Sequence, residues 1–248
     1  MESFQKKFGI LNGNILKFIA ALSMLIDHIG VIFFPRLQIL RIIGRLALPI
    51  FAFMIAQGCK YTKNKLRYFF SVFTLAFACQ TVYFLYNGDT YMNVLITFSL
   101  SIIIIYALQN FKNTLFRAES QAKKVSAALL LILSVVAVFI LNIFFEIDYG
   151  FPGCMLAVFA SMMQMPENAP EKLKKLDCLP IHVGLMALGL IALAIASGKS
   201  QPFSLLAIPL LLLYSGKRGK MKTKYFFYIF YPSHLAVLEA ISLIFAAA

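Results

Sequence analysis

An aspartate and a histidine stand side by side in a run that is otherwise almost wholly apolar, ALSMLIDHIGVIFF at positions 21–34. A charge at the middle of a bilayer costs roughly 2.5–3.5 kcal/mol, so such residues are expected to face the interior of a helix bundle and to have partners there. The pKa of an unperturbed histidine, about 6.5, suits a general base near neutral pH. We therefore predict that Asp27 and His28 belong to a catalytic or proton-handling site.

Two arginines follow in the next apolar run. Arg41 and Arg45 are four residues apart, so they share one helix face. The short connection between the two runs lets Asp27 reach them, which leaves His28, about 100° further round the helix, free to face a cavity. Pro49 cannot donate to the carbonyl of Arg45, which predicts a kink there. The alternative is an ion pair that serves helix packing alone, but buried ion pairs are weak stabilisers.

Two further polar residues lie on candidate membrane helices. Lys17 precedes His28 by eleven residues, about three helical turns, and so lies on the same face nearer the cytoplasmic end. His234 follows Pro232, whose missing N–H predicts irregular backbone at membrane depth. For Lys17 the alternative is an anchor at the membrane surface, and for His234 it is a packed core histidine. His182, at the start of another helix, is expected to be an interfacial residue.

Carboxylates and cations outside the membrane predict binding surfaces. Glu146 and Asp148, with Tyr149 beside them, lie in the segment FEIDYGFPG and are predicted to receive a cationic acceptor such as an amine. A solvated turn is the equal alternative.

On the opposite side, Lys60 and Lys63 are predicted to bind the phosphates of an anionic cofactor together with Lys17. The cationic loops also set the orientation of the chain, so this inference rests on charge alone.

The elements that carry these residues are membrane helices. The chain has 248 residues, of which 61% are apolar, against about 45–50% in soluble domains. Its mean hydropathy is +0.83, and the apolar residues fall in long blocks. We predict one all-α, polytopic bundle over residues 1–248, surrounded by membrane lipid. Its nine predicted spans are 14–34, 37–59, 66–86, 91–109, 124–145, 147–164, 180–197, 202–214 and 225–245.

The charge pattern gives the orientation. Lysine and arginine number 23 against 10 acidic residues. Nineteen of these cations fall in the loops on one side and two, Arg36 and Lys199, on the other. The positive-inside rule then puts the N-terminus in the cytoplasm and explains the excess charge without a nucleic-acid partner. No cleavable signal is expected, and the spacing of the four cysteines predicts no metal site.

Four segments together resemble the TraX family. They are LKFIAALSMLIDHIGVIFF, LRIIGRLALPIFAFMIAQGCKYTKNKLRYF, DYGFPG and FYIFYPSHL, in the family's order. TraX proteins are polytopic inner-membrane proteins, named for a conjugal-transfer protein associated with N-terminal acetylation of pilin, and they are similar to a wider group of transmembrane acyltransferases. A basic residue, ten intervening positions and a histidine mark the first helix of that group. Lys17 and His28 fit this spacing, with lysine where arginine is usual, and Arg41 and Arg45 are a loose counterpart of its arginine pair.

The resemblance implies transfer of an acetyl group from cytoplasmic acetyl-CoA to an acceptor near the outer half of the membrane, either a pilin-like protein or a glycan. His28 would be the base or a transient acetyl carrier, and His234 would assist. Asp27, Arg41 and Arg45 would hold the geometry.

Two other functions remain open at this point. A proton-coupled transporter would use Asp27, His28 and His234 as a proton relay, although transporters often show internal repeats and none is evident. A non-catalytic membrane scaffold would use the charges for assembly alone.

Overall fold

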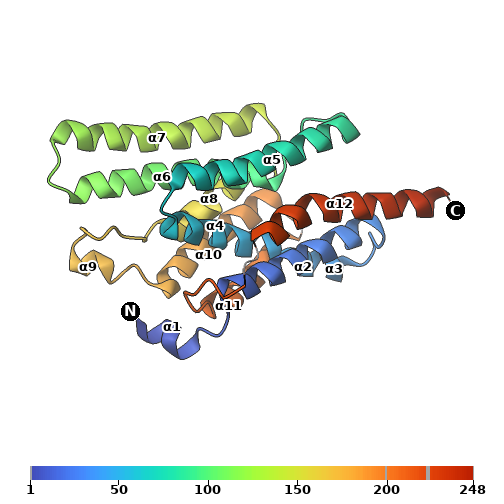
Figure 1. Cartoon of the computed structure of the whole chain (residues 1–248), viewed down its shortest axis with the longest axis horizontal. Helices are drawn as coiled ribbons and strands as arrows, with labels where there is room; N and C mark the ends of the chain where they lie inside the picture. The colour runs from blue at the N-terminus through green and yellow to red at the C-terminus, as the bar shows by residue number, and fades with distance from the viewer. Residues whose placement is uncertain (1, 199, 222–223, 248) are drawn as a thin grey trace. The chain divides into compact units, whose positions relative to one another are not determined.

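The computed structural model describes residues 2–198, 200–221 and 224–247, which form helices joined by short loops without any named β-strand. Among these described residues, seven helical segments are long and apolar enough to cross a membrane, so the chain is a multi-pass membrane protein. In Figure 1 they are α2 (Gly13–Ile32), α3 (Gln38–Gly44) with α4 (Ala47–Tyr61), α5 (Lys65–Asn87), α6 (Val94–Phe116), α7 (Gln121–Phe144), α10 (Leu179–Ser197) and α12 (Lys224–Ala247).

The other two predicted spans are also helical but shorter. Span 147–164 corresponds to α8 (Gly150–Ser161), and span 202–214 to the 3₁₀ helix η1 (Gln201–Leu206) followed by α11 (Ala207–Leu212). At 1.5 Å per residue, α8 is about 18 Å long, which is less than the roughly 30 Å hydrocarbon core. The remaining helices, α1 (Glu2–Phe8) and α9 (Glu171–Lys174), precede α2 and α10.

The chain divides into two compact units. Unit 1 consists of Ala52–Ala196, and unit 2 of Glu2–Phe51 together with Ser197–Ala248. Helix α4 begins in unit 2 and ends in unit 1.

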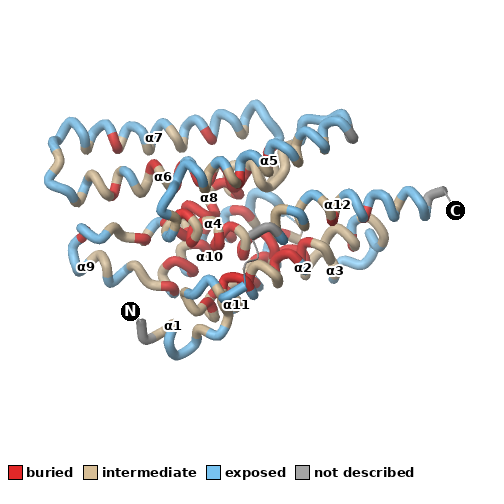
Figure 2. Tube along the Cα trace, viewed as in Figure 1, coloured by how far each residue is buried: buried red, intermediate tan, exposed pale blue. Residues whose placement is uncertain are grey.

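Helix α6 is the centre of unit 1 and packs against α5, α7 and α8. Small polar side chains allow close packing: Ser101 Oγ donates to the carbonyl of Cys154 at 2.7 Å. Within its described residues α7 buries only Ala127 and Val138, and Figure 2 shows most of its trace as exposed. An apolar helix that exposes so much of its surface is expected to face lipid.

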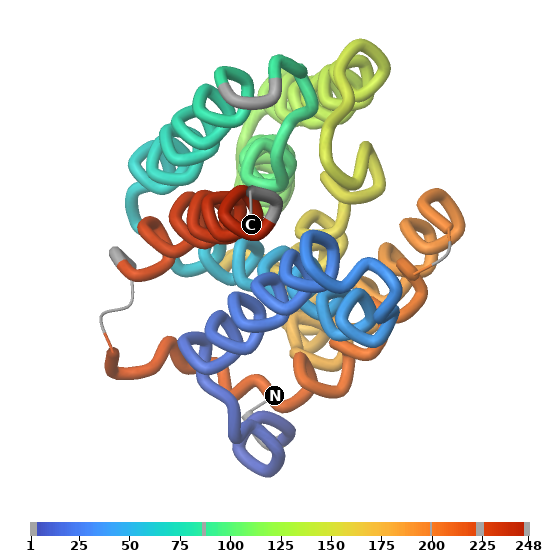
Figure 3. The backbone as a smooth tube through the Cα atoms, turned by 90° about the vertical axis from the view of Figure 1, so that its right-hand side faces the viewer, coloured from blue at the N-terminus to red at the C-terminus, as the bar shows by residue number. Residues whose placement is uncertain are grey.

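In unit 2, α2 packs against α3 and α12 (Figure 3). Helix α2 begins after Asn12, whose side-chain oxygen accepts hydrogen bonds from the N–H groups of Asn14 and Ile15. Phe18 contacts the rings of Phe226 and Phe227, which fixes the N-terminal half of α12 against α2. The sequence segments that predicted chemistry, one near each end of the chain, therefore share one compact unit.

The second span is interrupted near the position where a kink was predicted. Helix α3 ends at Gly44 and α4 begins at Ala47. The N–H of Arg45 bonds to the carbonyls of Arg41 and Ile42, both at 3.2 Å, so the turn tightens before the helix restarts. Pro49 supplies the cause, because it has no N–H for the carbonyl of Arg45.

The proline in α12 has a milder effect than predicted. The helix is continuous from Lys224 to Ala247, with Pro232 inside it, so the irregular backbone expected beside His234 does not interrupt the helix. A proline removes one hydrogen bond, and the turns on either side keep the other bonds of the helix.

Candidate functional site

Asp27 joins two arginines inside unit 2. Arg41 Nη1 donates to Asp27 Oδ2 at 2.7 Å, and Arg45 Nη2 donates to Asp27 Oδ1 at 3.4 Å. The side chains of Asp27 and Arg45 are 14% and 9% exposed, whereas that of Arg41 is 34% exposed. The predicted contact is therefore present. With Asp27 ionised, the three groups carry one net positive charge.

Gly44 allows this close packing of α2 against α3. A Cβ atom at position 44 would collide with the carboxylate and the Cβ of Asp27. Only a residue without a side chain lets the backbone of α3 approach the carboxylate in this way.

His28 presents one ring nitrogen for chemistry. Its Nδ1 lies 2.9 Å from the carbonyl oxygen of Met24. Since a carbonyl can only accept, Nδ1 carries the proton, and Nε2 of the neutral ring has the free lone pair. His28 is therefore oriented as a base through Nε2.

The second histidine lies against the first. The ring centroids of His28 and His234 are 5.1 Å apart, in an edge-on arrangement. His234 Nδ1 lies 2.9 Å from the carbonyl of Phe230, whose ring stacks on the imidazole. Its Nε2 is buried and lacks a partner among the described residues. Two imidazoles, each oriented through Nδ1, thus meet on the contact between α2 and α12.

The described residues offer no third metal ligand beside these histidines, because no group of three His, Cys, Asp or Glu side chains gathers there or elsewhere among them. The pair is suited to accepting and passing protons.

Gln201 is a member of the site that sequence reasoning missed. Arg45 Nη1 donates to Gln201 Oε1 at 3.2 Å, and the glutamine is 3% exposed. The predicted span began at residue 202, which left Gln201 in a loop. The available signal was a pair of polar residues, Gln201 and Ser204, at the start of an apolar segment.

Lys17 lies on α2 of the same unit, eleven residues before His28, which is roughly 16 Å along a helix axis. The loop after α11 adds cations at this end. The N–H groups of Gly13 and Asn14 donate to the carbonyls of Lys217 and Arg218, at 2.8 and 3.0 Å. Arg218 is close enough to Lys17 for their charges to interact. Charge at the N-terminal end of α2 is therefore more concentrated than the sequence suggested.

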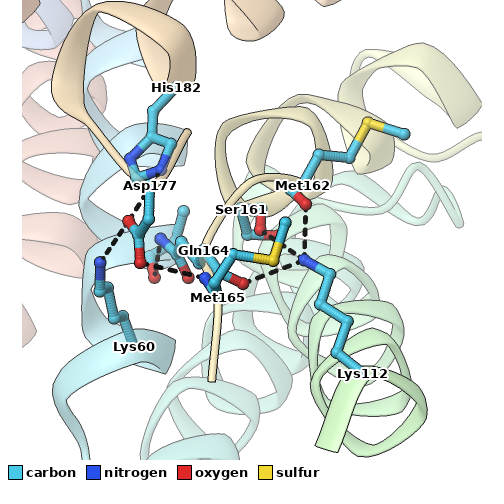
Figure 4. A network of polar contacts seen from close by, with 9 residues as sticks. Lys60, Lys112, Ser161, Met162, Gln164, Met165, Asp177 and His182 are labelled. Carbon is cyan, nitrogen blue, oxygen red and sulfur yellow. Dashed lines mark hydrogen bonds and ion pairs between the residues drawn. The ribbon is translucent and has the colours of Figure 1, made fainter. Parts of the chain in front are cut away.

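Lys60 and Lys63 belong to unit 1, and Lys60 already has a partner. Its Nζ lies 2.7 Å from Asp177 Oδ1, and His182 Nε2 lies 3.1 Å from the same oxygen (Figure 4). The N–H of Met165 donates to the other carboxylate oxygen at 3.0 Å. His182, expected at an interface, is 4% exposed. Lys63 is exposed.

The contacts of Asp177 make the stability of the fold depend on pH. Burial alone would raise the pKa of Asp177, but the contacts with His182, Lys60 and the Met165 N–H outweigh it and lower the pKa to about 2. An ordinary aspartate has a pKa of about 3.9. The ionised carboxylate therefore stabilises the fold fully above about pH 4, and this contribution is lost as the pH falls toward about 2.

We expect Asp177→Asn to lower the unfolding temperature between about pH 5 and 7 and to flatten the loss of stability below about pH 4. Circular dichroism can follow unfolding, since the chain has no tryptophan. The neighbouring exposed Glu171→Gln is the control. Parallel curves for the wild type and Asp177→Asn would contradict the assignment.

A buried lysine caps the C-terminal end of α8 in the same region (Figure 4). Lys112 is 8% exposed, and its Nζ bonds to the carbonyls of Ser161 and Gln164, at 3.3 and 3.1 Å, and to that of Met162. A cation there satisfies carbonyls that the end of a helix leaves unpaired. Its role is structural.

The predicted outer turn is an ordered part of unit 1. The N–H of Asp148 donates to the carbonyl of Met92 at 2.8 Å, and Tyr91 Oη donates to Asp148 Oδ1 at 2.7 Å. Burial and the charge of Asp148 raise the pKa of Tyr91, so the phenol keeps its proton. Glu146 is exposed. Tyr149 has a φ of +61°, a left-handed conformation that is uncommon for a residue other than glycine.

Comparison with known proteins adds the family. The sequence profile described as TraX protein matches residues 12–242. The chain is 28% identical over 255 residues to "Probable fimbrial assembly protein FimC, serogroup H1" from Dichelobacter nodosus, covering 90% of this chain and 92% of the relative. It is 34% identical over 103 residues to "Uncharacterized protein RP591" from Rickettsia prowazekii, covering 42% and 40% of the two chains. No solved structure matches.

Proposed function

The chain belongs to the TraX family, and we propose that it is an integral-membrane acetyltransferase of the bacterial inner membrane. In this proposal it moves an acetyl group from cytoplasmic acetyl-CoA to an amine or hydroxyl acceptor near the outer half of the membrane. The observation that carries the proposal is the pair His28 and His234, oriented through Nδ1, in the same compact unit as a cluster with excess positive charge. A base and a cationic group are the two parts that acyl transfer needs.

The chemistry follows from the free Nε2 of His28. The acceptor nitrogen or oxygen attacks the acetyl carbonyl carbon, while Nε2 takes the proton of the acceptor. The carbonyl π electrons move to oxygen, where the excess positive charge of the arginine cluster favours the negative charge. The C=O bond then re-forms, the C–S bond breaks, and the CoA thiolate leaves with the proton from the His28 imidazolium.

His234 supports this role of His28. Its ring lies edge-on to that of His28, and its own Nε2 is buried without a partner among the described residues. A second neutral imidazole gives the site a further proton acceptor beside this base.

The donor is proposed to bind with its phosphates at the cytoplasmic end of α2. Lys17 lies near the N-terminus of this helix, where Gly13 and Asn14 bond to the carbonyls of Lys217 and Arg218. Arg218 is close enough to Lys17 for their charges to interact. Lys60 and Lys63 remain candidates for the same role. Of these, Lys60 would have to share its charge with Asp177.

The acceptor is proposed to be a pilin-like protein or a glycan. The relative from Dichelobacter nodosus is described as a fimbrial assembly protein, which favours the first of these. Glu146, Asp148 and Tyr149 are proposed to receive the acceptor. Of the two carboxylates, that of the exposed Glu146 is the more accessible, because the carboxylate of Asp148 already accepts a hydrogen bond from Tyr91.

Acetyl-CoA binding tests this proposal. We expect the purified protein to bind acetyl-CoA in a calorimeter and Lys17→Glu to bind at least about tenfold more weakly, since a charge-assisted contact contributes roughly 1.5–3 kcal/mol. Lys172→Glu, at an exposed lysine near α9, is the matched control and should bind like the wild type. Absence of binding at millimolar acetyl-CoA by folded protein would contradict the proposal.

A proton-coupled transporter is the second candidate, because the contact between His28 and His234 also suits a proton relay. Asp27 weighs against it, since two guanidinium groups already occupy its carboxylate. Uptake of a solute by proteoliposomes under a proton gradient, without release of CoA from acetyl-CoA, would favour the transporter.

A further inference from the structure

Three hydrogen-bond donors gather without acceptors at the start of η1. Gln201 is 3% exposed, Ser204 is 0% exposed and Arg45 is 9% exposed. Within the part of the chain that the structure describes, Gln201 Nε2, Ser204 Oγ and Arg45 Nε are buried and lack partners. Buried polar groups are normally paired, so three such atoms in one small region call for a ligand.

The geometry of η1 places two of these donors together. In a 3₁₀ helix, side chains three positions apart eclipse one another. Gln201 and Ser204 have this spacing and are both buried, whereas Pro202 and Phe203 between them are exposed. The polar face of η1 therefore points into unit 2, and the apolar face points outward, as expected for an element at membrane depth.

Arg45 connects this face to the charged cluster. Its Nη1 donates to Gln201 Oε1, so the amide group of Gln201 has its oxygen occupied and its NH₂ group left to donate. Asp27 is the carboxylate that pairs with Arg41 and Arg45, and it leaves one positive charge uncompensated. Donors with excess positive charge, removed from water, are complementary to an oxygen that carries negative charge.

We infer that Gln201 and Ser204, together with Arg45, donate hydrogen bonds to the acetyl carbonyl oxygen during transfer. This inference rests on the proposed acetyltransferase function. When the acceptor attacks the carbonyl carbon and His28 takes its proton, the π electrons of the C=O bond move onto this oxygen. The three donors stabilise it until the C–S bond breaks and the carbonyl re-forms.

Two kinds of oxygen could occupy the site in its place. If the donors bind a carboxylate of the acceptor, they bind it equally in the ground state and the transition state. Loss of a donor would then raise KM for the acceptor and leave kcat unchanged. A structural water would contribute to stability alone. An oxyanion requires the donors mainly in the transition state, so their loss lowers kcat.

The test compares three substitutions in η1. Ser204→Ala removes one small donor and leaves Arg45 and Gln201 in place. Gln201→Glu replaces the NH₂ donor by a carboxylate that would itself fill a site built for negative charge. Phe203→Leu changes an exposed apolar side chain between them and is the matched control.

We expect Ser204→Ala to lower kcat for acetyl transfer about 100-fold, as loss of an oxyanion donor does elsewhere, with KM for acetyl-CoA changed less than about threefold. Gln201→Glu should lose turnover and unfold at the same or a higher temperature than the wild type, because its carboxylate meets Arg45. Phe203→Leu should turn over normally.

The outcomes separate this inference from the function on which it rests. If the wild type releases no CoA from acetyl-CoA, the proposed function fails, and this assignment fails with it. If the wild type is active and Ser204→Ala and Gln201→Glu match Phe203→Leu in kcat, the oxyanion assignment alone is wrong. A rise in KM for the acceptor at constant kcat would also overturn it and assign the donors to acceptor binding.

Discussion

Replacing His28 by alanine is expected to slow acetyl transfer by about a thousandfold, within the range of roughly 10²–10⁴ that general bases contribute. The reason is specific to one atom. Nδ1 is committed to the carbonyl of Met24, so Nε2 is the atom that accepts the proton of the acceptor. His28→Gln keeps a polar side chain there but supplies no base, so it should be as inactive as His28→Ala.

The chain provides a matched control for this prediction. His182→Gln changes a buried imidazole of unit 1, outside the cluster formed by His28 and His234. It should keep turnover while its unfolding temperature reports the lost contact with Asp177. The rate of CoA release, measured by a thiol reagent, separates the variants. Normal turnover by His28→Ala would remove His28 from the mechanism.

Removing the carboxylate of Asp27 should destabilise the protein by about 3–5 kcal/mol, the usual cost of leaving a buried charge without its partner. Asp27→Ala leaves Arg45, which is 9% exposed, with an uncompensated charge. Arg41→Ala should cost much less, because Arg41 is 34% exposed and water can solvate the remaining groups. The measurement is thermal unfolding in detergent, followed by circular dichroism.

A double substitution distinguishes the cost of an unpaired buried charge from the cost of lost side-chain packing. Replacing Asp27 by Leu and Arg45 by Met removes both charges and should recover part of the stability that Asp27→Ala loses, as buried ion pairs replaced by apolar residues often do. The recovered protein should remain inactive, because Arg45 is also proposed to bind the acetyl oxygen. If Asp27→Ala unfolds at the wild-type temperature, the carboxylate does not hold the cluster together.

Local sequence patterns predicted the helices and one part of the site well. Each long apolar block specifies its helix through residues that are neighbours in the chain, so each predicted span matches a helical segment. The contact between Asp27 and the arginines was also predictable, because a short connection joins the two helices and Arg41 and Arg45 are four residues apart.

Contacts between distant segments were not predictable in this way. His28 and His234 are separated by 206 positions, and nothing in either local pattern specifies that the rings meet. Gln201 and Ser204 share a face of the 3₁₀ helix, but the predicted span began at residue 202 and so left Gln201 in a loop. Lys60 was predicted to be available for phosphates, because its partner Asp177 lies 117 residues away.

Hydropathy alone did not predict how much of the two shorter apolar segments is helical. The segments 147–164 and 202–214 are mostly apolar, but the first is helical only from Gly150 to Ser161, and the second begins with a 3₁₀ helix. The orientation inferred from the positive loops depends on how both segments cross, so the cytoplasmic N-terminus remains a prediction.

Release of CoA by the protein in proteoliposomes shows whether the protein transfers the acetyl group to an acceptor. Acetyl-CoA would be supplied together with a short peptide that has a free N-terminus or, separately, with a free sugar, for the wild type beside His28→Ala. We expect CoA release that depends on one of these acceptors, appearance of the acetylated acceptor in equal amount, and about a thousandfold slower formation of both products with His28→Ala. Folded wild-type protein that binds acetyl-CoA but yields no acetylated product with either acceptor, or yields it equally with His28→Ala, would contradict the account.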